Sequence, residues 1–362
     1  MKPTRQLQQL GQSIWLDNIT RGLLDGGTLA GYIGDLSVTG LTSNPTIFEQ
    51  AIGKTGFYDA AIRRKSGEGK SGEPLFFELA LDDLTRAADL FRPVFDATDG
   101  IDGWVSLEVS PLLANDAPAT IASAARLHAL ARRRNLFIKI PGTPDGLTAI
   151  EESIFAGVPI NVTLLFSTAH YVAAAEAYLR GLERRLAAGR DARVDSVASL
   201  FISRWDVAVK DQVPEPLRNR LGIAVAMQSY RAYREMLASP RWKKLAAAGA
   251  RPQRLLFAST GTKDPAASET LYIDALAAPG TINTMPEKTL LAFADRGAVP
   301  GALPADGGDA EAVLAACRRA GVDDAALAQR LQQEGADAFS KSWRSLLQQI
   351  AGKTRELARA GT

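Results

Sequence analysis

Residues 136–142 read LFIKIPG, an apolar stretch with one lysine, Lys139, at its centre. An ammonium group is costly to bury without a partner, so Lys139 either extends its amine toward solvent or is held as a neutral amine. A lysine in a strand is often an edge or surface residue, and this structural explanation stays open for the stretch taken alone. A neutral amine, in contrast, is a nucleophile that forms a Schiff base with carbonyl compounds.

Similar apolar runs recur along the chain to about residue 290. They are nearly continuous in apolar character, as parallel strands covered on both faces are. Longer helical patterns, such as residues 119–134, 168–188 and 225–237, alternate with them. This alternation over eight runs predicts an α/β fold, a (β/α)8 TIM barrel with additional helices. The eight expected strands are residues 13–19, 40–44, 104–110, 136–141, 159–165, 194–202, 254–259 and 281–284.

The chain has 362 residues, more than the roughly 250 typical of this barrel, so additions are expected. Helical additions are predicted near residues 53–96, 205–249 and 304–362. None of the three has the composition of a separate domain. We therefore expect residues 1–362 to form a single barrel domain.

Composition excludes several classes of function. The 42 basic and 40 acidic residues are intermixed and leave a net charge of +2, with no basic block suited to a nucleic acid. No stretch approaches the roughly 18 apolar residues of a membrane span, and the first residues have no apolar signal core. A cytoplasmic protein that binds neither nucleic acid nor membrane is expected. The sequence does not indicate the oligomeric state.

Residues that bind metals are scarce. The only cysteine, Cys317, allows no internal disulfide and no thiolate cluster, and its Ala-rich surroundings are typical of a small buried side chain. The only histidines, His128 and His170, lie in helical patterns that suit packing or surface positions. Two imidazoles cannot supply the three-histidine site of a zinc-dependent aldolase. Any carbonyl chemistry is therefore expected to need no metal and no other cofactor.

Polar side chains stand late in the expected strands, where the functional groups of a (β/α)8 barrel lie. Each has an ordinary explanation of its own: Asp17 could cap a helix, Asn44 could form a turn before a proline, and the serines could satisfy backbone groups. Their occurrence together indicates a site. The set is Asp17, Asn44, Glu108, Lys139, Asn161, Thr163, Ser199 and Ser259.

These residue types suit Schiff-base chemistry at a lysine. One group must help to expel water from the carbinolamine, and another must take the proton of the hydroxyl next to the bond that breaks. The carboxyl groups of Glu108 and Asp17 can divide these tasks. A hydroxyl such as that of Thr163 can hold the water, while the amides of Asn44 and Asn161 can hold substrate hydroxyls without adding charge.

Five segments, in this order, resemble transaldolase, a family of the class I aldolase superfamily. They are TSNP at 42–45, VSLEVSP at 105–111, IKIP at 138–141, NVTLLFS at 161–167 and SLFISR at 199–204. The resemblance covers about residues 13–285, and WLDN at 15–18 is similar to the longer bacterial branch. It implies a metal-free enzyme of the pentose phosphate pathway. Such an enzyme moves a dihydroxyacetone unit from sedoheptulose 7-phosphate to glyceraldehyde 3-phosphate, giving erythrose 4-phosphate and fructose 6-phosphate.

The resemblance also implies a role for each residue of the set. Lys139 resembles the Schiff-base lysine and Asp17 the acid/base of carbon–carbon cleavage. Glu108 and Thr163 resemble the pair that handles the catalytic water. The residues that resemble those binding the dihydroxyacetone unit are Asn44 and Asn161.

The phosphate site of the family has a Ser-x-x-x-x-Arg spacing, which Ser199 and Arg204 match. Many members carry a second arginine directly after the next strand, where this chain reads STGTK at 259–263. Ser259 and Lys263, with the backbone amides around Gly261, are expected to take its place. An ordinary solvated loop lysine is the alternative for Lys263.

Two other functions compete with this interpretation. A fructose-6-phosphate aldolase, which releases free dihydroxyacetone, would need the same Lys139, but the small aldolases of the superfamily are shorter and tend to lack a glutamate at position 108. A barrel that only binds a sugar phosphate or a protein would be expected to lose one of its costly charges. The presence of Lys139, Glu108 and Asp17 together argues against it.

Overall fold

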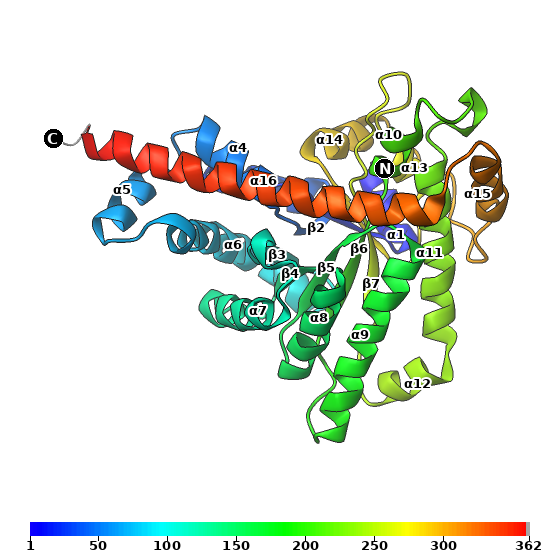
Figure 1. Cartoon of the computed structure of the whole chain (residues 1–362), viewed down its shortest axis with the longest axis horizontal. Helices are drawn as coiled ribbons and strands as arrows, with labels where there is room; N and C mark the ends of the chain where they lie inside the picture. The colour runs from blue at the N-terminus through cyan, green and yellow to red at the C-terminus, as the bar shows by residue number, and fades with distance from the viewer. Residues whose placement is uncertain (360–362) are drawn as a thin grey trace.

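Eight parallel strands close into a barrel, and their order around it is their order in the chain. The computed structural model that shows this describes residues 1–359. The predicted (β/α)8 barrel is therefore confirmed (Figure 1). The strands are β1 (Ser13–Leu16), β2 (Val38–Leu41), β3 (Trp104–Glu108), β4 (Leu136–Pro141), β5 (Ile160–Leu165), β6 (Ser196–Phe201), β7 (Arg254–Ala258) and β8 (Ile282–Met285).

Helices surround the barrel and follow most of its strands. In the first half of the chain they are α1 (Pro3–Leu10), α2 (Arg21–Asp25), α3 (Thr28–Asp35), α4 (Pro45–Lys54), α5 (Asp59–Gly67), α6 (Gly72–Ala97), the 3₁₀ turn η1 (Pro111–Leu113), α7 (Ala117–Ala131) and α8 (Pro144–Ala156). In the second half they are α9 (Thr168–Ala187), α10 (Ser203–Val209), η2 (Glu215–Leu217), α11 (Leu221–Ala238), α12 (Pro240–Ala247), α13 (Leu271–Ala275), α14 (Glu287–Arg296), α15 (Ala310–Arg319) and α16 (Asp324–Arg359).

The prediction for the second strand was wrong at both of its ends. Strand β2 spans Val38–Leu41, whereas residues 40–44 were expected. The strand stops early because Asn44 is the N-cap of α4, with its side chain accepting a hydrogen bond from the amide of Ile47. Pro45, the first residue of α4, cannot donate a ladder hydrogen bond and is well suited to that helix position.

Large aromatic side chains fill the barrel on the N-terminal side of Lys139. Phe137 lies two residues before Lys139 on β4, so both side chains point to the same face of the sheet. Its ring stacks on Trp104 at a centroid distance of 4.0 Å and lies 6.2 Å from the ring of Trp15. Gly40 makes room for this packing, because a Cβ there would lie 2.6 Å from the indole nitrogen of Trp15. A water-filled channel cannot form through this packed region.

The last helix, α16, crosses the mouth of the barrel and continues past it along α4, α5 and α6 (Figure 1). Its Trp343 packs edge-on against Phe76 of α6, with ring centroids 4.9 Å apart. Further along, Lys353 pairs with Asp59 of α5 at 2.5 Å. The helix thus ties a segment near residue 60 to the opposite end of the chain.

The predicted additions contain α5 and α6, α10 to α12, and α15 with α16. The last of these predictions ran to residue 362, and its final three residues lie outside those that the structure describes. Because α16 packs on both the barrel strand β5 and the inserted helices, we propose that barrel and additions form one domain.

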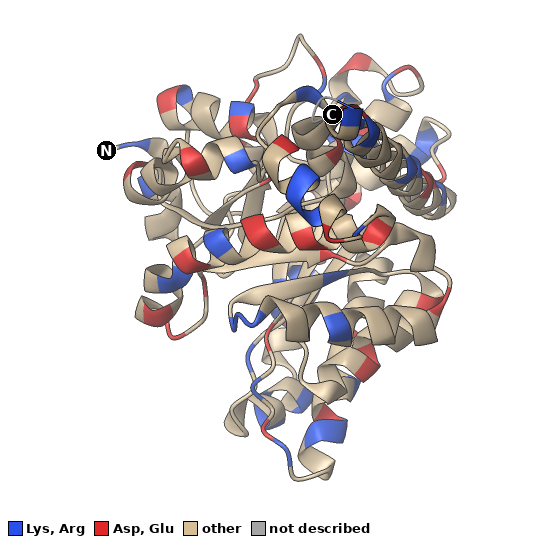
Figure 2. Cartoon of the chain, turned by 90° about the vertical axis from the view of Figure 1, so that its left-hand side faces the viewer, with Lys and Arg blue, Asp and Glu red and all other residues tan. Residues whose placement is uncertain are grey.

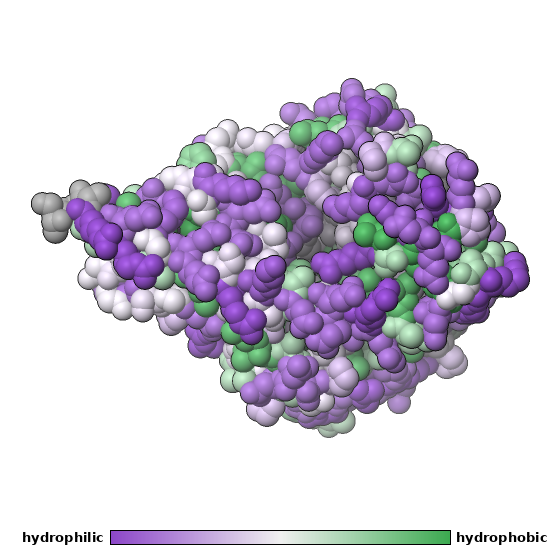
Figure 3. All heavy atoms as spheres, turned by 45° about the horizontal axis from the view of Figure 1, so that its top comes forward, coloured by the Kyte–Doolittle hydropathy of each residue, from purple (hydrophilic) through white to green (hydrophobic). Residues whose placement is uncertain are grey.

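Acidic and basic residues are intermixed along the ribbon in Figure 2. Figure 3 shows a mainly hydrophilic face in which hydrophobic residues form only small patches. Among residues 1–359, no helix is both long enough and apolar enough to pass through a lipid bilayer.

Candidate active site

Three neighbouring strands bring Glu108, Lys139 and Asn161 to one level of the barrel. In the parallel register Glu108 of β3 is opposite Lys139 of β4, and Lys139 is opposite Asn161 of β5. The Lys139 amine lies 3.3 Å from a carboxylate oxygen of Glu108 and donates to the carbonyl of Ser43 at 3.0 Å. Only 4% of Lys139 and 5% of Glu108 are exposed, so the explanation of Lys139 as a surface lysine is wrong.

The second carboxylate, Asp17, directly follows β1 and faces the same cavity. It accepts a hydrogen bond of 2.8 Å from the hydroxyl of Thr42, which also contacts the hydroxyl of Thr284 at 2.8 Å. Burial raises the pKa of Asp17 above its ordinary value, while the charge of Lys139 and the hydrogen bond from Thr42 oppose the rise. Burial likewise raises the pKa of Glu108, against the charge of Lys139.

The hydroxyl of Thr163 is buried and makes no hydrogen bond within the described part of the chain. It belongs to β5, is opposite Pro141 of β4, and lines the cavity that contains Lys139. Buried polar groups without a partner are uncommon, and one that faces a cavity can bind a water molecule or a ligand. Thr163 is therefore suited to hold a water close to the lysine.

The cavity at the strand ends measures about 240 Å³ and contains most of the predicted site residues. Those that line it are Asp17, Asn44, Lys139, Thr163, Ser199, Arg204, Ser259 and Lys263. Glu108 and Asn161 do not line it but contact residues that do. Asn161 accepts a hydrogen bond of 2.7 Å from Ser199 and donates one of 3.0 Å to Ser106, while Glu108 pairs with Lys139.

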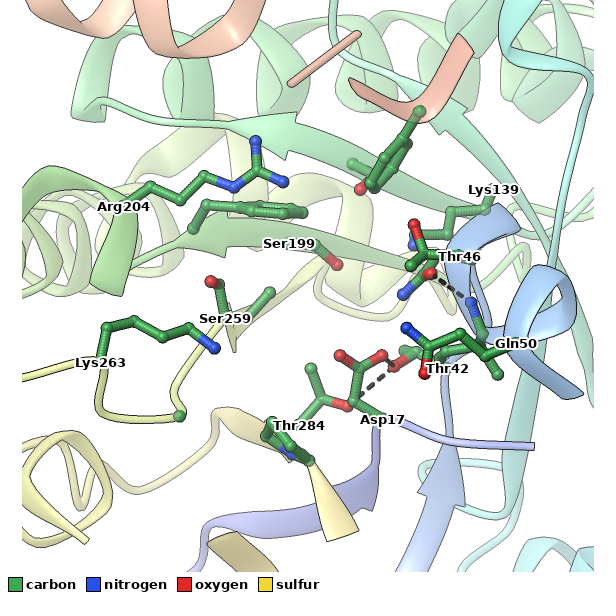
Figure 4. A pocket seen from close by; sticks show the side chains of 18 residues that line it. Asp17, Thr42, Thr46, Gln50, Lys139, Ser199, Arg204, Ser259, Lys263 and Thr284 are labelled. Carbon is green, nitrogen blue, oxygen red and sulfur yellow. Dashed lines mark hydrogen bonds between the residues drawn. The ribbon is translucent and has the colours of Figure 1, made fainter. Parts of the chain in front are cut away.

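Two cations lie at the other end of the cavity from Lys139 (Figure 4). Arg204, in the first turn of α10, has its guanidinium 5.5 Å from the ring of Phe201, and burial lowers its pKa. Lys263 enters from the loop after β7, next to Ser259. Within residues 1–359 neither Arg204 nor Lys263 forms an ion pair with a carboxylate. Two such cations beside hydroxyl groups suit a phosphate.

A family model described as Transaldolase/Fructose-6-phosphate aldolase matches residues 14–350. The chain belongs to this family. A transaldolase of Thermobifida fusca (strain YX) is 45% identical over 358 residues, which are 96% of this chain and 97% of the relative. A transaldolase of Frankia alni is 44% identical over 369 residues, covering 99% of both chains. One of Thiobacillus denitrificans is 43% identical over 358 residues, covering 97% of this chain and all of the relative. The resemblance predicted from five short segments is confirmed.

Several cavity residues of this family member escaped the prediction from sequence. Thr46 and Gln50 lie one helical turn apart on α4, so their i, i+4 spacing after TSNP could have indicated them. Thr42 belongs to that same segment, and Thr284 lies near the end of β8. Phe339 of α16 had no such signal. Its ring centroid lies 5.7 Å from the Lys139 amine, although 200 residues separate the two.

The structure tests the ordinary structural roles that the sequence allowed for Asp17, Asn44 and the two serines. Asp17 was the residue expected to cap a helix, but Thr20 caps α2. Asn44, for which a turn was expected, is instead the N-cap of α4 and also lines the cavity. Ser199 donates to the side chain of Asn161 and not to a backbone group. Ser259 contacts the hydroxyl of Ser203 at 3.0 Å and adopts a positive φ of 56°. Local capping and a position in the site are therefore compatible at Asn44.

The environment of Asp17 predicts a pH effect that a single substitution tests. Asp17 must be ionised to accept a proton, so the rate of a family reaction that uses it falls as the pH drops through its raised pKa. The hydrogen bond from Thr42 favours the ionised form, so Thr42→Val should raise the pKa further and move the acid limb of kcat/KM to higher pH. The measurement is the pH dependence of kcat/KM for a sugar phosphate.

Thr46→Val is the matched control. Thr46 also lines the cavity, but its hydroxyl contacts the hydroxyl of Ser342 at 2.9 Å and, within residues 1–359, forms no hydrogen bond with a carboxylate. The acid limb of kcat/KM in Thr46→Val should coincide with that of the unmodified protein. An acid limb that stays in place or moves to lower pH in Thr42→Val would contradict the role assigned to Asp17.

Proposed function

We propose that this chain is a transaldolase. It would transfer a dihydroxyacetone unit from sedoheptulose 7-phosphate to glyceraldehyde 3-phosphate through a Schiff base on Lys139, giving erythrose 4-phosphate and fructose 6-phosphate. One observation carries the proposal: the buried Lys139 amine lies 3.3 Å from Glu108 in a cavity whose other end holds Arg204 and Lys263, two cations that form no ion pair within residues 1–359. The 43–45% identity to proteins named transaldolase, over nearly their whole length, supports it.

Schiff-base formation uses Lys139, Glu108 and Thr163. Lys139 first passes a proton from its ammonium group to Glu108, 3.3 Å away. The neutral amine then attacks the C2 carbonyl of the ketose, and the carbinolamine loses its hydroxyl as water. Glu108 supplies the proton for this departure through a water held by Thr163. Its raised pKa suits an acid, because burial favours the protonated carboxyl. The iminium ion that results is the electron acceptor for the next step.

Carbon–carbon cleavage uses Asp17. Its carboxylate takes the proton of the C4 hydroxyl, the C3–C4 bond breaks, and the bonding electrons move through C3 to the iminium nitrogen, forming an enamine. The aldehyde product leaves and glyceraldehyde 3-phosphate enters. The enamine carbon attacks this aldehyde, Asp17 returns the proton to the new hydroxyl, and hydrolysis at Lys139 releases fructose 6-phosphate.

The remaining residues bind the substrate in this proposal. Arg204 and Lys263 pair with the phosphate, with the hydroxyls of Ser199 and Ser259 as further partners. The side-chain oxygen of Asn44 caps α4, which leaves its amide nitrogen for a hydroxyl of the dihydroxyacetone unit. The final residue of the set, Asn161, is oriented by Ser106 and Ser199 and would share its oxygen with a second hydroxyl.

We also propose that the protein acts in the cytoplasm. The sugar phosphates that this site would bind are intermediates of carbohydrate metabolism. The balanced surface charge agrees with a small-molecule substrate, since a nucleic-acid partner would favour a basic face.

A coupled assay tests transfer against simple aldol cleavage. With sedoheptulose 7-phosphate as donor, erythrose 4-phosphate should accumulate continuously only when glyceraldehyde 3-phosphate is present, because the enamine needs an acceptor to turn over. Free dihydroxyacetone, measured by enzymatic reduction, should stay far below the transferred product. Equal release of dihydroxyacetone with and without acceptor would assign the chain to the aldolases of the family, and no reaction at all would leave only the binding function.

Chemical trapping tests the role of Lys139. Borohydride added with fructose 6-phosphate should reduce the Schiff base and leave a three-carbon adduct on Lys139, identified by peptide mass spectrometry. Lys263→Arg serves as a comparison, since it keeps a cation at the phosphate end and should still be labelled at Lys139. An adduct on another lysine, or none, would exclude the proposed mechanism.

The phosphate end of the cavity predicts selectivity in a third measurement. Arg204→Ala should reduce kcat/KM for phosphorylated donors by about 2 kcal/mol or more, roughly thirty-fold, because it removes a charge-assisted contact. With unphosphorylated dihydroxyacetone as donor, the same variant should be nearly unchanged. Arg344→Ala, which alters an exposed arginine of α16, should affect neither. An equal loss for both kinds of donor would remove Arg204 from the phosphate site.

A further inference from the structure

Helix α16 forms hydrogen bonds with the ends of the two strands that carry Lys139 and Thr163. The side-chain nitrogen of Gln332 donates to the carbonyl of Gly142 at 3.1 Å and to the carbonyl of Leu164 at 2.9 Å. Gly142 directly follows β4, and Leu164 lies near the end of β5. One amide group therefore links the mouth ends of both strands to the helix that crosses them (Figure 1).

The NH₂ group of Gln332 suits this position. Both partners are carbonyl oxygens, which only accept hydrogen bonds, and the two hydrogens of Nε2 can serve one carbonyl each. The bonds join segments that are 168 and 190 residues distant from Gln332 in the chain. Such a contact can hold two strand ends at a constant separation.

The backbone that Gln332 holds is strained. Leu164 has a φ of +58°, a left-handed conformation that costs a branched residue about 1–2 kcal/mol. The pairing of β5 with β6 shifts register between Val162 and Leu165, so the ordinary ladder is interrupted at this point. The side chain of Leu164 consequently faces α16, where a Cβ on Gly335 would lie 2.9 Å from its Cδ2 atom.

The residue directly before this strained position is Thr163. Its carbonyl accepts a hydrogen bond of 2.8 Å from the amide of Gly142, while its buried hydroxyl has no partner among the described residues. Nothing else in that part of the chain therefore fixes the direction of the Thr163 hydroxyl through a hydrogen bond. Its direction depends on the backbone at Leu164 and Gly142, the two residues whose carbonyls Gln332 holds.

We propose that Gln332 is a positioning residue for Schiff-base formation, and this rests on the function proposed above. Gln332 holds the ends of β4 and β5 together. In this way it keeps the hydroxyl of Thr163 at a distance from Lys139 at which Thr163 can hold a water that transfers a proton between Glu108 and the carbinolamine on Lys139. Gln332 does not line the cavity, so we expect no contact between it and a substrate bound there. A displacement of about 1 Å in such a site can slow a reaction by as much as a hundred-fold.

The test compares Gln332→Met with Gln333→Met. The first variant keeps nearly the same length and removes only the two donated hydrogen bonds. The second makes the same chemical change at an exposed position of α16, where the side chain donates a hydrogen bond to Asp337 of the same helix. In single-turnover experiments with fructose 6-phosphate, the rate of appearance of the borohydride-trapped Lys139 adduct should fall ten-fold or more in Gln332→Met and stay within two-fold in Gln333→Met.

Two further measurements separate positioning from a general structural role. Inorganic phosphate should inhibit Gln332→Met with an inhibition constant within two-fold of the unmodified protein, since Arg204 and Lys263 are unaltered. In a Thr163→Val background, Gln332→Met should slow adduct formation by less than two-fold further, because its effect passes through the Thr163 hydroxyl. A purely structural role would weaken phosphate binding and would add its full effect in that background.

Adduct formation in Gln332→Met within two-fold of the unmodified protein, or effects of the two substitutions that simply multiply, would overturn the inference. If Gln332→Met does not fold, Gln332→Glu carries the same comparison, since it keeps the size and places an acceptor against two acceptors. Failure of the unmodified protein to form any Lys139 adduct would instead contradict the proposed function, so the two failures are distinguishable.

Discussion

The burial of the Lys139 amine is the constraint on which the site depends. A lysine in the interior of a barrel is tolerated only with partners, and here Glu108 and the carbonyl of Ser43 provide them at 3.3 and 3.0 Å. Burial of the two carboxyl groups themselves raises the pKa of Glu108 and of Asp17, and the charge of Lys139 opposes both rises. The desolvation that makes this arrangement costly also makes it suited to proton transfer.

Both the parallel barrel and the last helix, α16, contribute residues to the cavity wall. Eight strands bring their carboxyl ends to one rim, which sets Asp17, Lys139 and Arg204 around a common space. Helix α16 crosses that rim. Its Phe339 lines the cavity, and its Gln332 donates hydrogen bonds to the ends of β4 and β5. The aromatic packing below Lys139 closes the other side, so the chemistry is confined to the mouth.

Much of the fold and of the site could be predicted because both follow from local patterns. Apolar runs that alternate with helical patterns indicate a (β/α)8 barrel. A polar residue near the end of such a run indicates a position at the rim of the barrel, where the site lies. The boundaries were less predictable where side chains compete with the strand. The second strand was expected to include Asn44, but it ends at Leu41. Asn44 instead caps α4, which begins at Pro45, because capping there satisfies the backbone better than a longer strand would.

The sequence by itself indicated the residues of the candidate site, because a lone lysine in an apolar strand and carboxylates at the ends of two others can be recognised from the period of a strand alone. The tertiary structure alone decided which residues contact one another across the chain. Phe339 stands 200 positions after Lys139, and Gln332 reaches Leu164 across 168 residues. Nothing local marks either residue, because a helix face that covers a barrel looks in sequence like any amphipathic helix, and only packing specifies which strand ends it meets.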